Sequence, residues 1–183
     1  MDHGGGEKQF AIVGNMNAIT YKEVFPLIKD NKVWLGTTTP KEFTEPNGVT
    51  KKFGNINWYT NLDHGIRHEK LILDNMANNL RFNKSLKKRL DKYGIQNEYP
   101  KYDNYDAIEV PLAKCIPSDY KGVMGVPISF LYKYNPEQFE IIGEMSGTKG
   151  FPFTNGTDGR AKFYLNDKSV YARLLIRHKL LKE

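Results

Sequence analysis

The sequence has few of the residues that mark disulfide-rich, zinc-cysteine and membrane-spanning proteins. Cys115 is the one cysteine among 183 residues, which excludes an internal disulfide and a cysteine-based zinc site. No apolar run approaches the roughly 20 residues of a membrane span. The N-terminus lacks the charged and then apolar pattern of a secretory signal. These absences favour a cytoplasmic protein without a membrane partner.

Motifs of common enzyme chemistry are also missing. The sequence contains neither a phosphate-binding P-loop nor a recognisable Ser, His and Asp arrangement. His64 and His68 have a spacing that can bind zinc, but no convincing third ligand accompanies them and the His-Glu-x-x-His order is absent. The residues therefore predict no metal site and no catalytic residue within this chain.

The composition indicates a folded and basic protein. Hydrophobic residues make up 39% and aromatic residues 13%, and the formal net charge is +6. The length suits one domain, or one domain with a small appendage. Positive charge alone fits a merely soluble basic surface as well as a nucleic-acid partner. Its clustering favours a surface that contacts phosphates. The candidates are Lys84, Lys87, Lys88, Arg89, Arg173 and Arg177.

The first part of the chain has the pattern of an α/β region, which we expect to span residues 8–95. The apolar run Phe10–Val13 predicts a buried parallel strand. Thr20 and Glu23 have capping-box spacing, which predicts a helix running to Ile28. A strand should follow at residues 32–36. Residues 37–52 should form a long loop, either irregular or with a short hairpin that turns at Asn47-Gly48.

The rest of that region and the second region have mixed patterns. A strand is expected over residues 55–62, with helices over residues 67–80 and 85–93 that end at Gly94. Residues 96–183 read as a β-leaning region with strands at 107–110 and 139–142, a short helix at 129–132 and a hairpin over 162–177. Gly122 and Gly125 indicate a close backbone approach or tight packing. Residues 1–7 should be a flexible lead-in.

Several long segments together resemble the EcoRI-type adenine-specific DNA methyltransferase family. They are IVGNMNAITYKEVFPLIKDNKVWLG, NWYTNLDHGIRHEKLIL, YPKYDNYDAIEV, DYKGVMGVPISFLYKYNPEQFEIIG and VYARLLIRHK. The resemblance implies an α/β fold, with the late strands of a Rossmann-like methyltransferase sheet followed by an irregular α+β target-recognition region.

The same resemblance implies a role for the tract around β-strand residues 57–61. In such enzymes it lies beside the pocket that receives a flipped adenine, which needs aromatic faces and amide groups. Trp58 and Tyr59 would supply the faces, and Asn57 and Asn61 would read the edge of the base. The alternatives are that Trp58 belongs to the core and that Asn61 closes a turn.

The sequence departs from the family at two motifs. It has no Gly-containing cofactor loop after a first strand and no Asn-Pro-Pro-aromatic motif. We therefore expect the chain to be the C-terminal, DNA-recognition part of an enzyme and to bind no S-adenosylmethionine by itself. The run Phe10–Val13 would then be an open edge, covered by a second copy, a partner protein or the lead-in. The alternative function is a phage or mobile-element inhibitor, of the anti-restriction or anti-CRISPR type, that reuses the half-fold.

Overall fold

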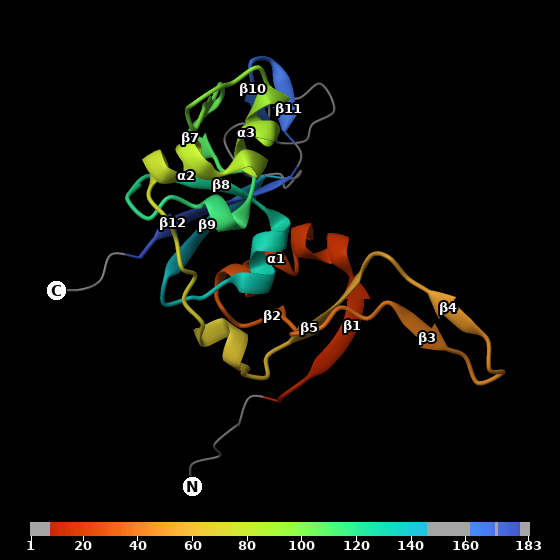
Figure 1. Ribbon diagram of the computed structural model, residues 1–183. Coiled ribbons are helices and arrows are strands. Elements are labelled where there is room, and N and C mark those ends of the chain that lie inside the picture. The colour runs from red at the N-terminus through yellow and green to blue at the C-terminus, as the bar shows by residue number, and fades with distance from the viewer. Residues whose placement is uncertain (1–7, 146–161, 171, 180–183) are drawn as a thin grey trace, which may run out of the picture.

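The computed structural model describes residues 8–145, 162–170 and 172–179, and the expected lead-in, residues 1–7, lies outside them. These residues form a mixed α/β structure with several sheets. One sheet lies in each half of the molecule, and a narrow hairpin extends away from the body (Figure 1). Buried apolar side chains from both halves contribute to one core, in which Phe130, Phe139 and Phe163 are the largest fully buried.

The first sheet has three antiparallel strands in the order β1-β5-β2. They are β1 (Ala11–Asn15), β5 (Ile56–Thr60) and β2 (Trp34–Leu35). The expectation of a buried parallel strand at residues 10–13 was wrong. Strand β1 runs antiparallel to β5 at the sheet edge, where Ile12 is 58% and Val13 38% exposed. A short apolar run fits an edge strand as well as a central one, and only the pairing partner decides between them.

The helix that the capping box predicted is shorter and begins later. A 3-10 helix, η1 (Met16–Thr20), comes first, and α1 (Phe25–Lys29) follows with Pro26 in its first turn. The Thr20 hydroxyl donates to the carbonyl oxygen of Asn17 at 2.9 Å, so it caps no helix. Proline fits this first turn because the amide it lacks has no partner there.

A hairpin connects β2 to β5 within the first sheet, and a helical segment connects β5 to the second sheet. Strands β3 (Glu42–Thr44) and β4 (Thr50–Lys52) pair antiparallel, with Gly48 at φ +82° in the turn, which confirms the hairpin. After η2 (Gly65–His68), residues 69–75 are irregular, so the long helix expected over residues 67–80 is not formed. The helices are α2 (Met76–Phe82) and α3 (Lys84–Asp91), capped by Asn75 and Asn83.

The second sheet has five strands in the order β6-β7-β8-β12-β9, with β7 and β8 parallel and the other pairs antiparallel. The strands are β6 (Lys101–Tyr102), β7 (Tyr105–Glu109), β8 (Met124–Pro127), β9 (Phe139–Met145) and β12 (Arg173–His178). The 3-10 helices η3 (Ala113–Cys115) and η4 (Ile128–Lys133) connect them. The expected hairpin is split, since β10 (Phe163–Leu165) pairs with β11 (Lys168–Val170), while β12 inserts between β8 and β9.

Candidate nucleic-acid interface

Helix α3 presents a compact group of cationic side chains to solvent. Leu86 and Leu90, four residues apart, are 0% and 1% exposed and anchor the helix, while the Asn83 side chain accepts the Leu86 amide at 3.0 Å. The opposite face holds four of the predicted phosphate-binding residues. These are Lys84, Lys87, Lys88 and Arg89, all exposed. None of the four forms an ion pair with a described residue, so each ammonium or guanidinium group is available to an external anion.

The two arginines of β12 are arranged differently. Arg173 contacts Glu109 through Nη2 at 2.7 Å and Nε at 3.0 Å, and the Glu109 side chain is 0% exposed. Burial disfavours the charge of Arg173, but its bonds to Glu109 hold the Arg173 pKa above its ordinary value. Arg177 is half-exposed and pairs with Glu140 at 2.8 Å. The structure therefore brings neither arginine into the α3 cluster as an unpaired cation.

Three of the four base-pocket candidates, Asn57, Trp58 and Tyr59, lie on strand β5 and alternate between its two faces. Asn57 and Tyr59 are buried, at 1% and 4% exposure, whereas Trp58 is half-buried against Gly36. The Tyr132 hydroxyl donates to Asn57 Oδ1, and Asn57 Nδ2 has no partner among the described residues. The Tyr59 hydroxyl donates to the carbonyl oxygen of Asn15 at 2.8 Å, and burial raises the pKa of Tyr59 to about 12.

Asn61, the fourth candidate, connects the end of β5 to the backbone before β1. Its Oδ1 accepts the Phe10 amide at 2.9 Å, and its Nδ2 donates to the Lys8 carbonyl at 3.0 Å. Thr60 adds a bond from its hydroxyl to the Phe10 carbonyl at 2.6 Å. These bonds continue the β1–β5 pairing beyond the last paired residues. Both the oxygen and the nitrogen of the Asn61 side-chain amide therefore already have partners within the protein.

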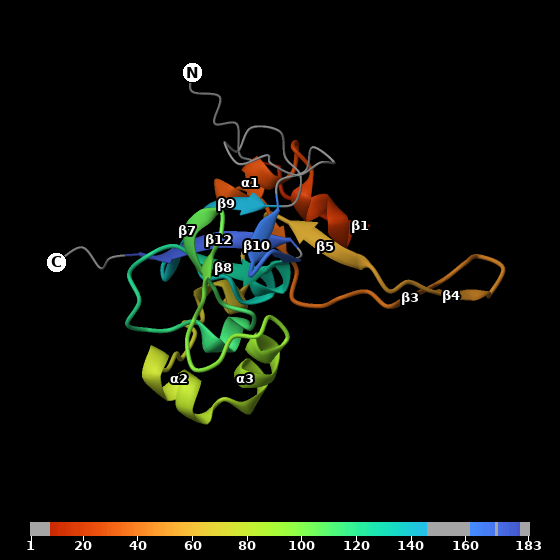
Figure 2. The same cartoon turned by 90° about the horizontal axis from the view of Figure 1, so that it is seen from above.

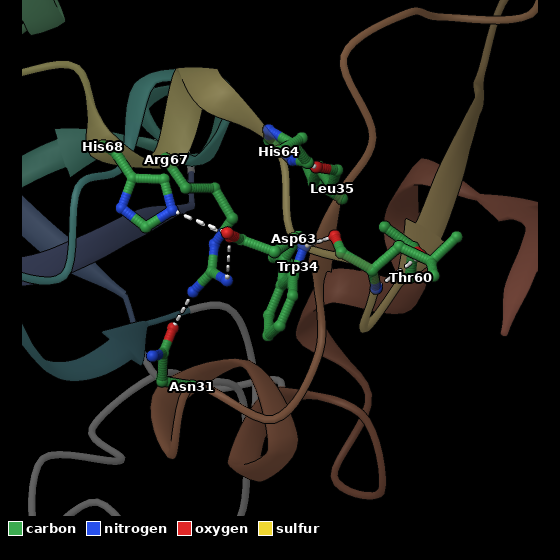
Figure 3. Close-up of polar contacts among 9 residues, drawn as sticks. Asn31, Trp34, Leu35, Thr60, Asp63, His64, Arg67 and His68 are labelled. Carbon is green, nitrogen blue, oxygen red and sulfur yellow. Dashed lines mark hydrogen bonds and ion pairs between the residues drawn. The ribbon is translucent and has the colours of Figure 1, made fainter. Parts of the chain in front are cut away.

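A buried guanidinium beside β2 is the main polar feature that the sequence did not identify (Figure 3). The Cζ atom of Arg67 lies 3.3 Å from the centre of the Trp34 ring, and Arg67 Nη2 donates to Asn31 Oδ1. Asp63, at 3.8 Å from Nη1, is the nearest carboxylate and is largely exposed. His68 hydrogen-bonds the same carboxylate at 2.9 Å, and that bond lowers the pKa of Asp63. Burial lowers the pKa of Arg67.

This cluster encloses a small cavity with two unpartnered polar atoms. His64 Nε2 lies 3.0 Å from the Leu35 carbonyl, so this nitrogen carries the proton and Nδ1 is an acceptor. Both His64 Nδ1 and Arg67 Nε are buried without a described partner, and both residues line the cavity. The free space is about 10 Å³, room for one water molecule. Neither an adenine base nor S-adenosylmethionine fits there, and the cavity is lined by none of Asn57, Trp58, Tyr59 and Asn61.

Little in the sequence could have revealed this cluster. Trp34 and Arg67 come from segments that were assigned to a strand and to a helix, and they meet only because η2 folds back over β2. The described residues contain no group of three or more His, Cys, Asp or Glu side chains that could hold a metal ion. No helix among them is long and apolar enough to cross a membrane.

Comparison of the sequence with known proteins identifies a family. The family model for the adenine-specific methyltransferase EcoRI matches residues 5–179. The chain belongs to this EcoRI methyltransferase family. It is 40% identical to the type II methyltransferase M.EcoRI of Escherichia coli over 195 residues, covering 97% of this chain and 52% of that protein.

Two mycoplasma proteins of the same kind are also similar. The type II methyltransferase M.MgeORF184P of Mycoplasma genitalium is 33% identical, over 93% of this chain and 57% of its own length. M.MpnI of Mycoplasma pneumoniae is 30% identical, over 97% of this chain and 58% of its own length. The chain thus spans about half the length of these EcoRI-family relatives, and they give no support to the alternative of a phage inhibitor. No solved structure matches the chain significantly.

Proposed function

We propose that this chain is the DNA-recognition part of an adenine-specific, restriction-modification methyltransferase, C-terminal in the complete enzyme. The observation that carries the proposal is the exposed cationic face of α3, where Lys84, Lys87, Lys88 and Arg89 form no ion pair with any residue that the structure describes. Such side chains bind phosphates and release counterions from DNA. Arg177 can join them by exchanging its surface partner Glu140, whereas Arg173 is committed to Glu109. The proposal therefore retains Arg177 and leaves Arg173 out.

In this proposal the chain transfers no methyl group by itself. The sequence holds no Asn-Pro-Pro-aromatic motif, and Asn135-Pro136 is followed by Glu137. The cavity beside β2 that His64 and Arg67 line is too small for S-adenosylmethionine. The three-stranded sheet would be the late-strand end of a Rossmann-like sheet, and Asn57 and Tyr59 would support the base pocket from its wall. Trp58, the one half-buried aromatic of the tract, would face the base.

Two measurements test the proposal. A gel shift of the purified chain with a duplex should show affinity that falls steeply between 50 and 200 mM salt, by roughly 500-fold for five phosphate contacts at a slope of roughly 0.9 each. Labelled methyl transfer from S-adenosylmethionine to the same duplex should remain at background. Absence of DNA binding at low salt would overturn the recognition role. Methyl transfer by the chain alone would overturn the proposal that it is not catalytic by itself.

A further inference from the structure

The β3–β4 hairpin is the most isolated element of the structure. It leaves the body between β2 and β5, and both views show it extending away from all other elements (Figures 1 and 2). All six of its strand residues are exposed. A lone two-stranded hairpin is marginally stable in water, so a protein that maintains one needs local bonds to hold it.

The hairpin has such bonds along its whole length. Phe43 and Phe53 meet edge to face with their ring centres 5.7 Å apart, and the Phe53 amide donates to the Lys41 carbonyl at 2.7 Å. The Thr44 and Thr50 hydroxyl groups are 3.1 Å apart across the strands. These bonds order the hairpin before any partner binds it, which lowers the entropy cost of binding.

The turn is held as firmly as the strands. The Glu45 amide donates to the Val49 carbonyl at 2.9 Å, and the Val49 amide donates to Asn47 Oδ1 at 3.0 Å. Lys51 forms an ion pair with Glu45 across the strands. The hairpin is therefore a preformed ribbon up to its tip.

The side chains that remain are suited to a duplex. The Phe43 and Phe53 rings pack on each other but remain 40% and 42% exposed. Thr44, Thr50 and Lys52 share one face with Glu42, and Lys41 and Lys51 flank the other. Lysines on both edges of a ribbon can contact phosphates on either side of a groove. The Thr44 and Thr50 hydroxyl groups, which bond each other, can exchange that bond for one to a base edge. The major groove of B-DNA admits a two-stranded ribbon.

We propose that the β3–β4 hairpin, residues 41–53, is an arm that enters the major groove of the DNA substrate, with Lys41 and Lys52 on phosphates and the turn at Asn47–Val49 next to base edges. The inference rests on the proposed DNA-recognition role. It adds a second contact region, continuous along the chain with β5, to the cationic face of α3.

Cross-linking tests the placement directly. Cys115 is buried, so Val49→Cys at the tip and Leu27→Cys on α1 each add one exposed thiol, replacing side chains that are 51% and 40% exposed. Each variant is incubated with a mixed-sequence duplex that carries a disulfide tether in either the major or the minor groove. The tip variant should cross-link at least tenfold faster than the α1 variant, and faster to the major-groove tether. Equal rates for the two variants, or a preference for the minor groove, would overturn the proposal.

Binding by charge variants separates this proposal from the broader one. Lys41→Ala with Lys52→Ala should weaken duplex binding about tenfold and reduce the salt slope by up to about 1.8, since each phosphate contact contributes roughly 0.9. Lys29→Ala with Lys32→Ala, on and after α1, is the matched control and should change neither quantity.

If the unaltered chain binds DNA and the arm variant binds equally well, the arm proposal fails while the broader DNA-recognition proposal stands. If the unaltered chain binds no DNA, both proposals fail. Loss of a protein complex in sedimentation, with DNA binding intact, would make the arm a protein contact and overturn the inference.

Discussion

At the scale of single residues, the buried polar groups of the second sheet depend on one another. Tyr102 donates to Glu109, and Glu109 in turn accepts from Arg173. Gly125 makes this possible, because a Cβ atom there would lie 2.0 Å from the Tyr102 hydroxyl oxygen. The glycine pair in the sequence signalled a close approach or tight packing, and the structure shows that a tyrosine ring occupies that space at Gly125.

Breaking this group on one side should be costly. Arg173→Ala leaves the fully buried Glu109 carboxylate without its cation, and we expect a loss of roughly 3–5 kcal/mol in the free energy of unfolding. Urea denaturation measures it. Arg177→Ala, which opens the exposed pair with Glu140, is the matched control and should cost less than about 1 kcal/mol. Similar losses for both variants would contradict the buried pairing.

The buried tyrosines give the protein a defined limit at alkaline pH. Burial raises the pKa of both Tyr59 and Tyr134 to about 12 from an unfolded value of 10.0. A group whose folded pKa is raised contributes stability that is complete below the unfolded pKa and is lost as the pH rises through the folded one. Urea midpoints should therefore hold up to about pH 10 and fall from pH 10 to 12. Tyr59→Phe should lessen the fall, and an unchanged profile would argue against burial.

At the scale of elements, the sequence predicted local pairing better than it predicted direction or length. The turn at Asn47-Gly48, strand β5 and the stop at Gly94 follow from local side-chain chemistry, and all three are present. The antiparallel course of β1 and the insertion of β12 between β8 and β9 depend on distant partners that no local pattern specifies. The Trp34–Arg67 stacking was beyond sequence reasoning for the same reason.

Helix α3 carries the prediction at this scale. Lys87→Ala with Lys88→Ala removes two exposed charges without touching the anchors Leu86 and Leu90, so folding should be unchanged and duplex affinity should fall about tenfold at low salt. Fluorescence anisotropy with a labelled duplex measures it, with Lys29→Ala plus Lys32→Ala as the control. The idea fails if the two pairs of substitutions have equal effects.

At the scale of the whole molecule, the exposed edge of β1 marks where another surface would add to the first sheet. One side of β1 pairs with β5, and its apolar residues Ile12 and Val13 remain exposed. Exposed apolar edge strands favour pairing with further strands. We therefore expect a second copy of the chain, or a partner protein, to pair here.

Val13→Lys tests this expectation, because a charge on an edge strand opposes strand addition. Size-exclusion chromatography with light scattering should show association of the unaltered chain that the variant loses, with unchanged thermal stability of the monomer. Leu27→Lys, at an exposed site on α1, is the control. A clean monomer whose residue 11–15 amides exchange rapidly with deuterium would support an unoccupied edge and refute self-association.

The position of β12 has a consequence for how the protein is made. β12 is the last of the five strands to leave the ribosome, yet it hydrogen-bonds to both β8 and β9. Until residues 173–178 have been synthesised and have cleared the exit tunnel, those two strands have no common neighbour and the sheet stays open. A nascent chain stalled before Arg173 would therefore hold this half of the protein with an incomplete sheet, and it would be a ready client for chaperones.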